Sequence, residues 1–215
     1  MNKVSQKLII FDLDGTLIDS CRDLAAAVNG MRHHYGLSPL SVETVTGYVG
    51  NGVRMLVTRA LQDTDIDIDE ALRIQQPIYR DHVIDQTTLY PGVQAGLQHL
   101  HDAGHVLAVA TNKPAEACEL ILNHLGIRDL FISVLAGGNF PVLKPEPDMI
   151  LAIMATAGIK ADDTWVVGDN YTDLESARRA GARSIFVTYG YGDPGQEEPT
   201  LRCDSFCEVV KVFDR

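Results

Sequence analysis

The sequence has few cysteines, a shortage of basic residues and no long apolar run. Its four cysteines are scattered and form no CxxC pair, which argues against a zinc site or dithiol redox chemistry. No apolar stretch approaches the roughly 20 residues that a membrane helix needs. Lys and Arg number 18 against 29 Asp and Glu, so the net charge of −11 supplies no positive field for nucleic acid or an anionic membrane. We therefore expect neither a nucleic-acid partner nor a membrane partner.

The motifs of several enzyme classes are also missing. The chain contains no HExxH pair, no GxSxG nucleophile elbow and no GxxxxGKS/T phosphate loop, so serine hydrolase and nucleotide-triphosphatase activities have no support. The N-terminal segment becomes acidic at Asp12 before the apolar region of a signal peptide is complete. We expect a cytoplasmic protein.

Short apolar runs recur along the chain and alternate with segments of helical periodicity. The first run ends abruptly at Asp12, and the runs occupy residues 7–11, 106–110, 131–135, 165–167 and 184–188. Buried strands separated by helices are typical of βαβ units. The sequence therefore predicts an α/β fold with a Rossmann-like parallel sheet.

The pattern changes between residues 20 and 88. Helical periodicity continues there without a candidate for a buried strand. We expect an all-helical cap at 20–88, inserted into a sheet core formed by 1–19 and 89–215, with hinges between the two parts. The turn-rich segment at 189–195 is interpreted as a surface connection.

Two carboxylates, Asp12 and Asp14, follow the first strand one residue apart. Alternate residues of an extended chain face the same way, so both can approach one reacting group, Asp12 as nucleophile and Asp14 as proton donor and acceptor. Gly15 permits a tight turn directly after them. A solvated turn at the end of a strand is an equally good interpretation of this motif alone.

Two further clusters supply hydrogen-bond donors and a cation. Thr111 and Asn112 end a predicted strand where a helix begins, and a hydroxyl with free backbone amides forms a phosphate cradle there. A plain helix cap is the other interpretation. Lys144 lies in a stretch stiffened by two prolines and could stabilise the charge of a phosphoryl group and of Asp12. An isolated lysine is more often a surface residue.

Asp169 and Asp173 follow the strand predicted at 165–167. Asp169 lies where it can complete a hard-cation site with Asp12, and oxygen ligands with retained water suit Mg²⁺. Asp173 can hold a coordinating water or Lys144. It can also serve simply as a favourable acidic residue in the first turn of a helix.

The order of these clusters resembles that of the haloacid dehalogenase (HAD) superfamily of phosphatases over almost the whole chain. The segment FDLDGT is similar to the first motif of that family, while Thr111, Lys144 and the segment GDNYTD match its second, third and fourth motifs. The resemblance implies the HAD fold and two steps, in which Asp12 attacks phosphorus while Asp14 protonates the leaving alkoxide and then activates water. It also implies Mg²⁺, held by the side chains of Asp12 and Asp169 and the backbone carbonyl of Asp14.

A glycine-rich loop of the predicted cap is relevant to the identity of the substrate. Gly50, Asn51 and Arg54 belong to a segment similar to the cap loop of bacterial phosphoglycolate phosphatases, so we expect them to bind substrate together with Thr111 and Asn112. A helix-to-helix turn is the other interpretation of this loop. The resemblance implies Mg²⁺-dependent hydrolysis of a small phosphorylated metabolite, 2-phosphoglycolate, by a monomer or homodimer.

Other reactions share these motifs. A sugar phosphomutase of the β-phosphoglucomutase type carries all four motifs and differs in the cap, and pyrophosphate or another sugar phosphate could be the substrate. A dehalogenase needs neither a metal nor the second aspartate, so Asp14 speaks against it. A non-catalytic binding module would be expected to have lost a nucleophile or a metal ligand. Asn170 stands where many members of the family carry Ser.

Overall fold

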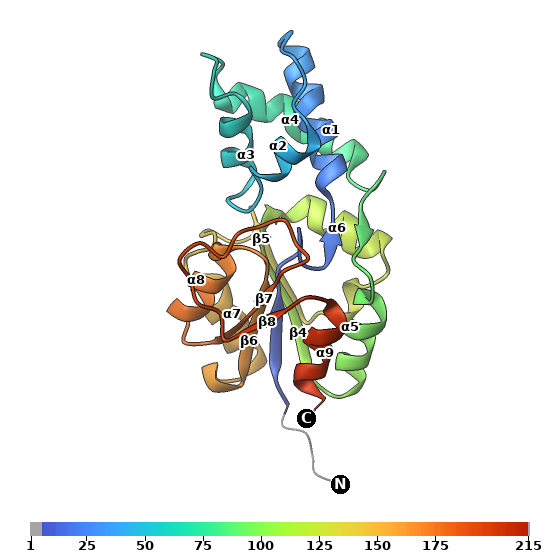
Figure 1. The fold of residues 1–215 in the computed structure, drawn as a ribbon, viewed down its shortest axis with the longest axis vertical. Coiled ribbons are helices and arrows are strands. Elements are labelled where there is room, and N and C mark those ends of the chain that lie inside the picture. The colour runs from blue at the N-terminus through green and yellow to red at the C-terminus, as the bar shows by residue number, and fades with distance from the viewer. Residues whose placement is uncertain (1–5, 215) are drawn as a thin grey trace.

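A parallel six-stranded sheet forms the centre of the computed structural model, which describes residues 6–214 (Figure 1). Its strands follow the order β5-β4-β1-β6-β7-β8. Their bounds are β1 (Leu8–Phe11), β4 (Val106–Pro114), β5 (Ser133–Gly137), β6 (Thr164–Gly168), β7 (Arg183–Val187) and β8 (Leu201–Cys203). The predicted Rossmann-like parallel sheet is confirmed. The prediction about a signal peptide falls partly on residues 1–5, which lie outside the described residues.

Helices cover both faces of the sheet because alternate side chains of each strand point to opposite faces. Leu8 and Ile10 of β1 pack with α7 (Asp148–Ala157) and α8 (Tyr171–Arg179). Ile9 and Phe11 belong to the second cluster of buried residues, to which the other layer of helices contributes. That layer consists of α5 (Val93–Asp102), α6 (Ala115–His124) and α9 (Phe206–Phe213). Two short 3-10 helices, η1 (Arg128–Leu130) and η2 (Ala161–Asp163), lie in the connections.

The single tryptophan lies in this core. Trp165, near the amino end of β6, is 6% exposed. Its ring meets that of Phe213 of α9 edge to face, with the centroids 5.7 Å apart. The contact ties the last helix to the sheet at the end opposite the strand carboxyl termini.

Four helices stand together beyond the carboxyl edge of the sheet (Figure 1). They are α1 (Cys21–His34), α2 (Val42–Thr46), α3 (Val53–Ala60) and α4 (Ile68–His82). The chain leaves the sheet core through β2 (Ile18–Asp19) and returns through β3 (Thr88–Leu89), and these two strands pair antiparallel. The predicted inserted all-helical cap is thus present in the fold.

A buried carboxylate links the segment that enters the cap to the segment that returns from it. Asp23 is 1% exposed and accepts hydrogen bonds from the backbone N–H groups of Gln86 and Thr87 and from the Thr87 hydroxyl. Thr87 is buried and these bonds supply its partners, so Asp23 fixes the start of α1 against the returning segment. Within residues 6–214, no helix has the length and apolar character needed to cross a membrane.

Candidate active site

The site forms at the carboxyl ends of β1 and β6, the two central strands. The chain continues from β1 toward β4 on one side and from β6 toward β7 on the other, so the strand order reverses between them. Open α/β sheets bind ligands at such a switch point. Asp12 follows β1 directly, and Asp169 follows β6 directly.

Three carboxylates and one lysine converge at this point. Oxygen atoms of Asp12, Asp169 and Asp173 all lie within 4.8 Å of one another. The Lys144 Nζ lies 2.9 Å from Asp12 Oδ1 and 2.5 Å from Asp173 Oδ1, and it donates a hydrogen bond of 2.6 Å to the carbonyl of Ala110. The Lys144 side chain is 1% exposed, so this cation is part of the interior.

The pKa values in this cluster are shifted because several negatively charged carboxylates are buried close together. Burial raises the pKa of Asp169 well above its usual value, and the neighbouring Asp12 and Asp173 raise it further. Burial also raises the pKa of Asp173 to about 6, against the opposing effect of Lys144. Although burial by itself lowers the pKa of Lys144, the charges of Asp12 and Asp173 shift it upward overall. One lysine does not balance three carboxylates.

The donor set fits a divalent cation. Oδ1 of Asp12 is buried and, among the described residues, has the ion pair with Lys144 but no well-directed hydrogen bond. Oδ1 of Asp169 accepts, within residues 6–214, only the long 3.2 Å bond of the Thr16 hydroxyl. Hard oxygen ligands with spare lone pairs, in a cluster with excess negative charge, are what Mg²⁺ requires.

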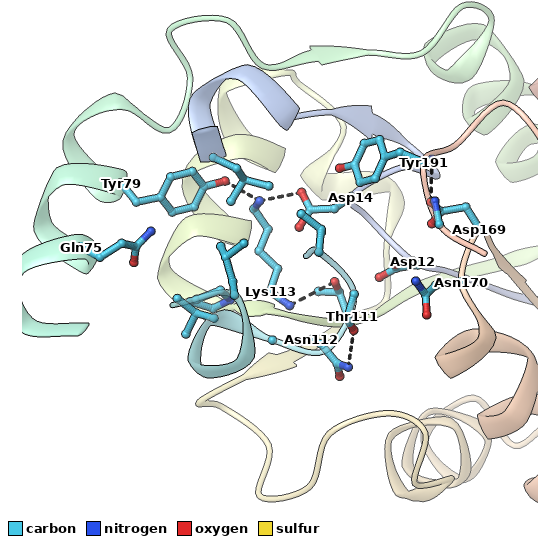
Figure 2. A pocket seen from close by; sticks show the side chains of 18 residues that line it. Asp12, Asp14, Gln75, Tyr79, Thr111, Asn112, Lys113, Asp169, Asn170 and Tyr191 are labelled. Carbon is cyan, nitrogen blue, oxygen red and sulfur yellow. Dashed lines mark hydrogen bonds and ion pairs between the residues drawn. The ribbon is translucent and has the colours of Figure 1, made fainter. Parts of the chain in front are cut away.

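Asp14 lies apart from that cluster and faces the cap. Its Oδ1 accepts hydrogen bonds of 2.5 Å from the Ser20 hydroxyl and 2.6 Å from the Lys113 Nζ. Lys113 also donates to the hydroxyl of Tyr79 on α4 at 2.5 Å (Figure 2). Burial alone would lower the pKa of Lys113, but the Asp14 carboxylate outweighs it and the net shift is upward. Asp14 therefore faces a permanent cation that the cap helps to hold.

Asn112 ties three loops together. Its Nδ2 donates to the carbonyls of Gly50 in the cap loop and of Lys144, each at 2.9 Å, and its Oδ1 accepts from the Lys144 backbone N–H. Thr111 is 2% exposed, lines the same pocket and accepts a bond from the Lys113 N–H. Both residues predicted to form a phosphate cradle thus line the pocket that Asp12 also lines.

The three cap-loop residues have different positions. Gly50 lines the pocket. Asn51 is not among the lining residues, because its amide donates to the Tyr171 hydroxyl and accepts from Arg59. The structure does not bring Arg54 to the site: its side chain is 61% exposed and forms an ion pair with Asp69 at the start of α4. α3 directs Arg54 to the acidic helix start of α4, where negative charge is expected.

The segment at 189–195 connects β7 to β8 and is partly exposed, as predicted, but it also lies against the site, which the prediction of a surface connection did not include. The backbone N–H groups of Tyr191 and Gly192 donate to Asp169 Oδ2 at 3.1 and 2.8 Å. Close contact explains the glycines: a Cβ at Gly190 would lie 2.4 Å from both the Asp169 Cβ and the Gly15 carbonyl. The segment orients Asp169 through its backbone, which a reading of side chains could not detect.

One pocket joins these groups and encloses about 620 Å³, including the part open to solvent. One end of the pocket is lined by Asp12, Thr111, Asn170 and Asp169 (Figure 2). The other end is lined by Gln75, Tyr79 and Lys113. No role is predicted from the sequence for Gln75, Tyr79, Lys113 or Tyr191. Lys113 alone had a signal, because it adjoins the Thr111-Asn112 motif.

An α/β sheet with an acidic cluster at its switch point, a buried lysine and a helical cap defines a class of hydrolases. Residues 9–187 match the model of the haloacid dehalogenase-like hydrolase family. The chain belongs to this family.

Individual relatives are similar over the whole chain. The chain is 38% identical to a phosphoglycolate phosphatase of Chromobacterium violaceum, with 99% of both chains covered. It is 36% identical to phosphoglycolate phosphatase 1 of Pseudomonas aeruginosa, with 97% of this chain and 80% of that protein covered. The crystal structure of a predicted phosphoglycolate phosphatase from Haemophilus somnus superposes with a TM-score of 0.92 at 32% identity, covering 96% of this chain and 97% of that one.

Proposed function

We propose that this protein is a phosphatase that hydrolyses 2-phosphoglycolate through an aspartyl-phosphate on Asp12. The observation that carries the proposal is the position of Asp12, whose carboxylate is held by Lys144 in a pocket that Asp14 also lines. The relatives named above act on this substrate according to their names.

The side chains divide the reaction between them. An oxygen of Asp12 attacks phosphorus, the bond from phosphorus to the leaving oxygen breaks, and Asp14 supplies the proton for that oxygen. Asp14 then takes a proton from water, which attacks the aspartyl-phosphate and releases phosphate. Lys144, Thr111 and the Asn112 region offset the charge on the transferring oxygens, which is the main demand in phosphoryl transfer. Asp173 positions Lys144 through the ion pair.

Mg²⁺ is the proposed cofactor. The side chains of Asp12 and Asp169 and the backbone carbonyl of Asp14 would hold it, and when bound it supplies positive charge that offsets the charge of the phosphoryl oxygens. The convergence of the carboxylates and the raised pKa of Asp169 support this assignment.

The cap at 20–88 is proposed to close over a sheet core made of 1–19 and 89–215. The two crossings at β2 and β3 support a hinged arrangement, and the hydrogen bond from Asn112 to the Gly50 carbonyl links the cap loop to the core. Closure would exclude bulk water during the first step. Gly50, which lines the pocket, is the cap-loop residue best placed to meet the substrate.

A phosphoester panel tests the proposal. Turnover of 2-phosphoglycolate, hexose phosphates and pyrophosphate is measured with and without Mg²⁺ for the wild type and for Asp12→Asn. We expect phosphate release from 2-phosphoglycolate that needs Mg²⁺ and falls by at least about 10³-fold in the variant, because nucleophilic catalysis is lost. Equal activity of Asp12→Asn, or release from none of these compounds, would contradict the mechanism. Isomerisation of a hexose phosphate would show a mutase instead.

A further inference from the structure

A glutamine of the cap is buried in the pocket without using its amide. Gln75 of α4 is 0% exposed, and neither its Nε2 nor its Oε1 has a hydrogen-bond partner among the described residues. Such an amide costs free energy in the unliganded protein. Its side chain lines the pocket, and the amide end is directed into it (Figure 2). We therefore expect a ligand in the pocket to form hydrogen bonds with the Gln75 amide.

Two further donors lie beside it. Tyr79 follows Gln75 by four residues, so the two side chains share one face of α4. The Tyr79 hydroxyl accepts from Lys113, which leaves its own O–H free to donate. The Lys113 ammonium has three N–H donors, of which Asp14 and Tyr79 take two within the described part of the chain. The pocket thus presents three donors at its cap end, one of which is the Lys113 cation.

The rest of the cap-side wall is apolar or glycine. It is formed by Leu24, Val49, Gly50, Gly52, Val53 and Leu56. On this wall, the polar side chains that can bind the leaving part of a substrate are those of Gln75, Tyr79 and Lys113. A ligand that presents only acceptors and a negative charge best matches three donors of which one is a cation.

We propose that Gln75, together with Tyr79 and Lys113, binds a carboxylate carried by the leaving group of the phosphoester. The inference rests on the proposed phosphatase function and names the substrate class: small phosphoesters with an acidic leaving group. Gln75 offers its Nε2, and the other two residues offer an O–H and an N–H. The carboxylate would lie at the opposite end of the pocket from Asp12, which fixes the direction of the substrate.

The test compares 2-phosphoglycolate with its neutral amide, phosphoglycolamide, which has the same size and shape. The readout is the ratio of the two kcat/KM values. We expect the wild type to prefer the carboxylate by about 10- to 100-fold, the range of a lost charged hydrogen bond. Gln75→Leu should reduce this preference by about 10-fold. Gln75→Glu should abolish it, because a like charge then faces the substrate.

A stability measurement separates this role from a structural one. Since the amide is unpartnered, Gln75→Leu should not lower the thermal unfolding temperature, whereas a residue that holds the fold would lower it. Gln76→Leu is the matched control: it lies on the same helix, is exposed, and should leave both the ratio and the unfolding temperature unchanged.

The outcomes distinguish the two proposals. Hydrolysis of both compounds without preference, or an unchanged preference in both Gln75 variants, overturns the carboxylate site and leaves the phosphatase function standing. Hydrolysis of neither compound, nor of any phosphoester in the panel, overturns both proposals. A lower unfolding temperature of Gln75→Leu with an unchanged preference assigns Gln75 to the fold.

Discussion

Lys144→Met is the substitution that most directly probes the charge balance of the site. The methionine keeps most of the volume and removes the ammonium group, which contacts Asp12 at 2.9 Å and Asp173 at 2.5 Å and donates to the Ala110 carbonyl at 2.6 Å. What remains is a group of three carboxylates within 4.8 Å of one another. The Asp173 side chain is fully buried and that of Asp12 is 10% exposed, so water and salt screen the repulsion only weakly.

The expected loss is large for one substitution. Breaking a buried ion pair by removing one partner costs about 3–5 kcal/mol, because the other charge stays buried and unpaired. That is a substantial part of the roughly 5–15 kcal/mol that stabilises a typical domain. The loss should shrink in acid: without Lys144 the pKa of Asp173 rises above its present value of about 6, so the carboxylate becomes neutral more easily.

Urea unfolding of metal-free protein measures this loss, at neutral pH and again near pH 5. Lys7→Met is the control, since Lys7 pairs with Asp163 at the surface and its removal should leave the free energy of unfolding nearly unchanged. A loss below about 1 kcal/mol at neutral pH would refute the reasoning, because it would equal the effect of a surface pair. So would a loss that does not diminish in acid.

Two other predictions concern the same cluster. Because folding raises the pKa of Asp173 from 3.8 to about 6, the folded protein holds this proton more tightly than the unfolded chain does. The stability that this proton contributes is fully present below pH 3.8 and is lost as the pH rises through about 6. Urea unfolding of metal-free protein should therefore show a free energy of unfolding that falls between these two pH values. A free energy of unfolding that does not change across this window would contradict the prediction. Gly190→Ala should lower phosphatase activity and Mg²⁺ affinity, as measured by titration calorimetry, because the new Cβ would lie 2.4 Å from Asp169. In the control Gly47→Ala the new Cβ makes only ordinary contacts, so phosphatase activity and Mg²⁺ affinity should stay unchanged. If the two variants have the same activity and the same Mg²⁺ affinity, the 189–195 segment does not position Asp169.

Most of the fold could be predicted from the sequence because its signals are local. Each central strand is a short apolar run that ends at a polar residue, as at Asp12 and Asp169, and burial on both faces makes such runs continuous. The helical cap was predictable because no such run interrupts its periodicity. β8 has two exposed residues in three and gave no such signal.

The site was only partly predictable, and the reason is distance along the chain. Asp12, Thr111 and Asp169 were found because each lies at the carboxyl end of a predicted strand, and the topology of a parallel sheet brings strand ends together. Lys144 lies in the connection after β5 and was found only because its place in the order of motifs matches the family. Gln75 lies in the middle of an amphipathic helix, where nothing local distinguishes a pocket residue from a core residue. Arg54 was expected at the substrate because of its loop, but a nearby carboxylate decides where it points.

The lone tryptophan makes the molecule a selective optical reporter. Trp165 packs on Phe213 inside the sheet core, and the segment 20–88 contains no tryptophan. Emission therefore follows the melting of the core, while far-ultraviolet ellipticity also follows the four cap helices. If the cap unfolds before the core, ellipticity will fall while emission stays constant; if the two parts form one cooperative unit, both curves will coincide.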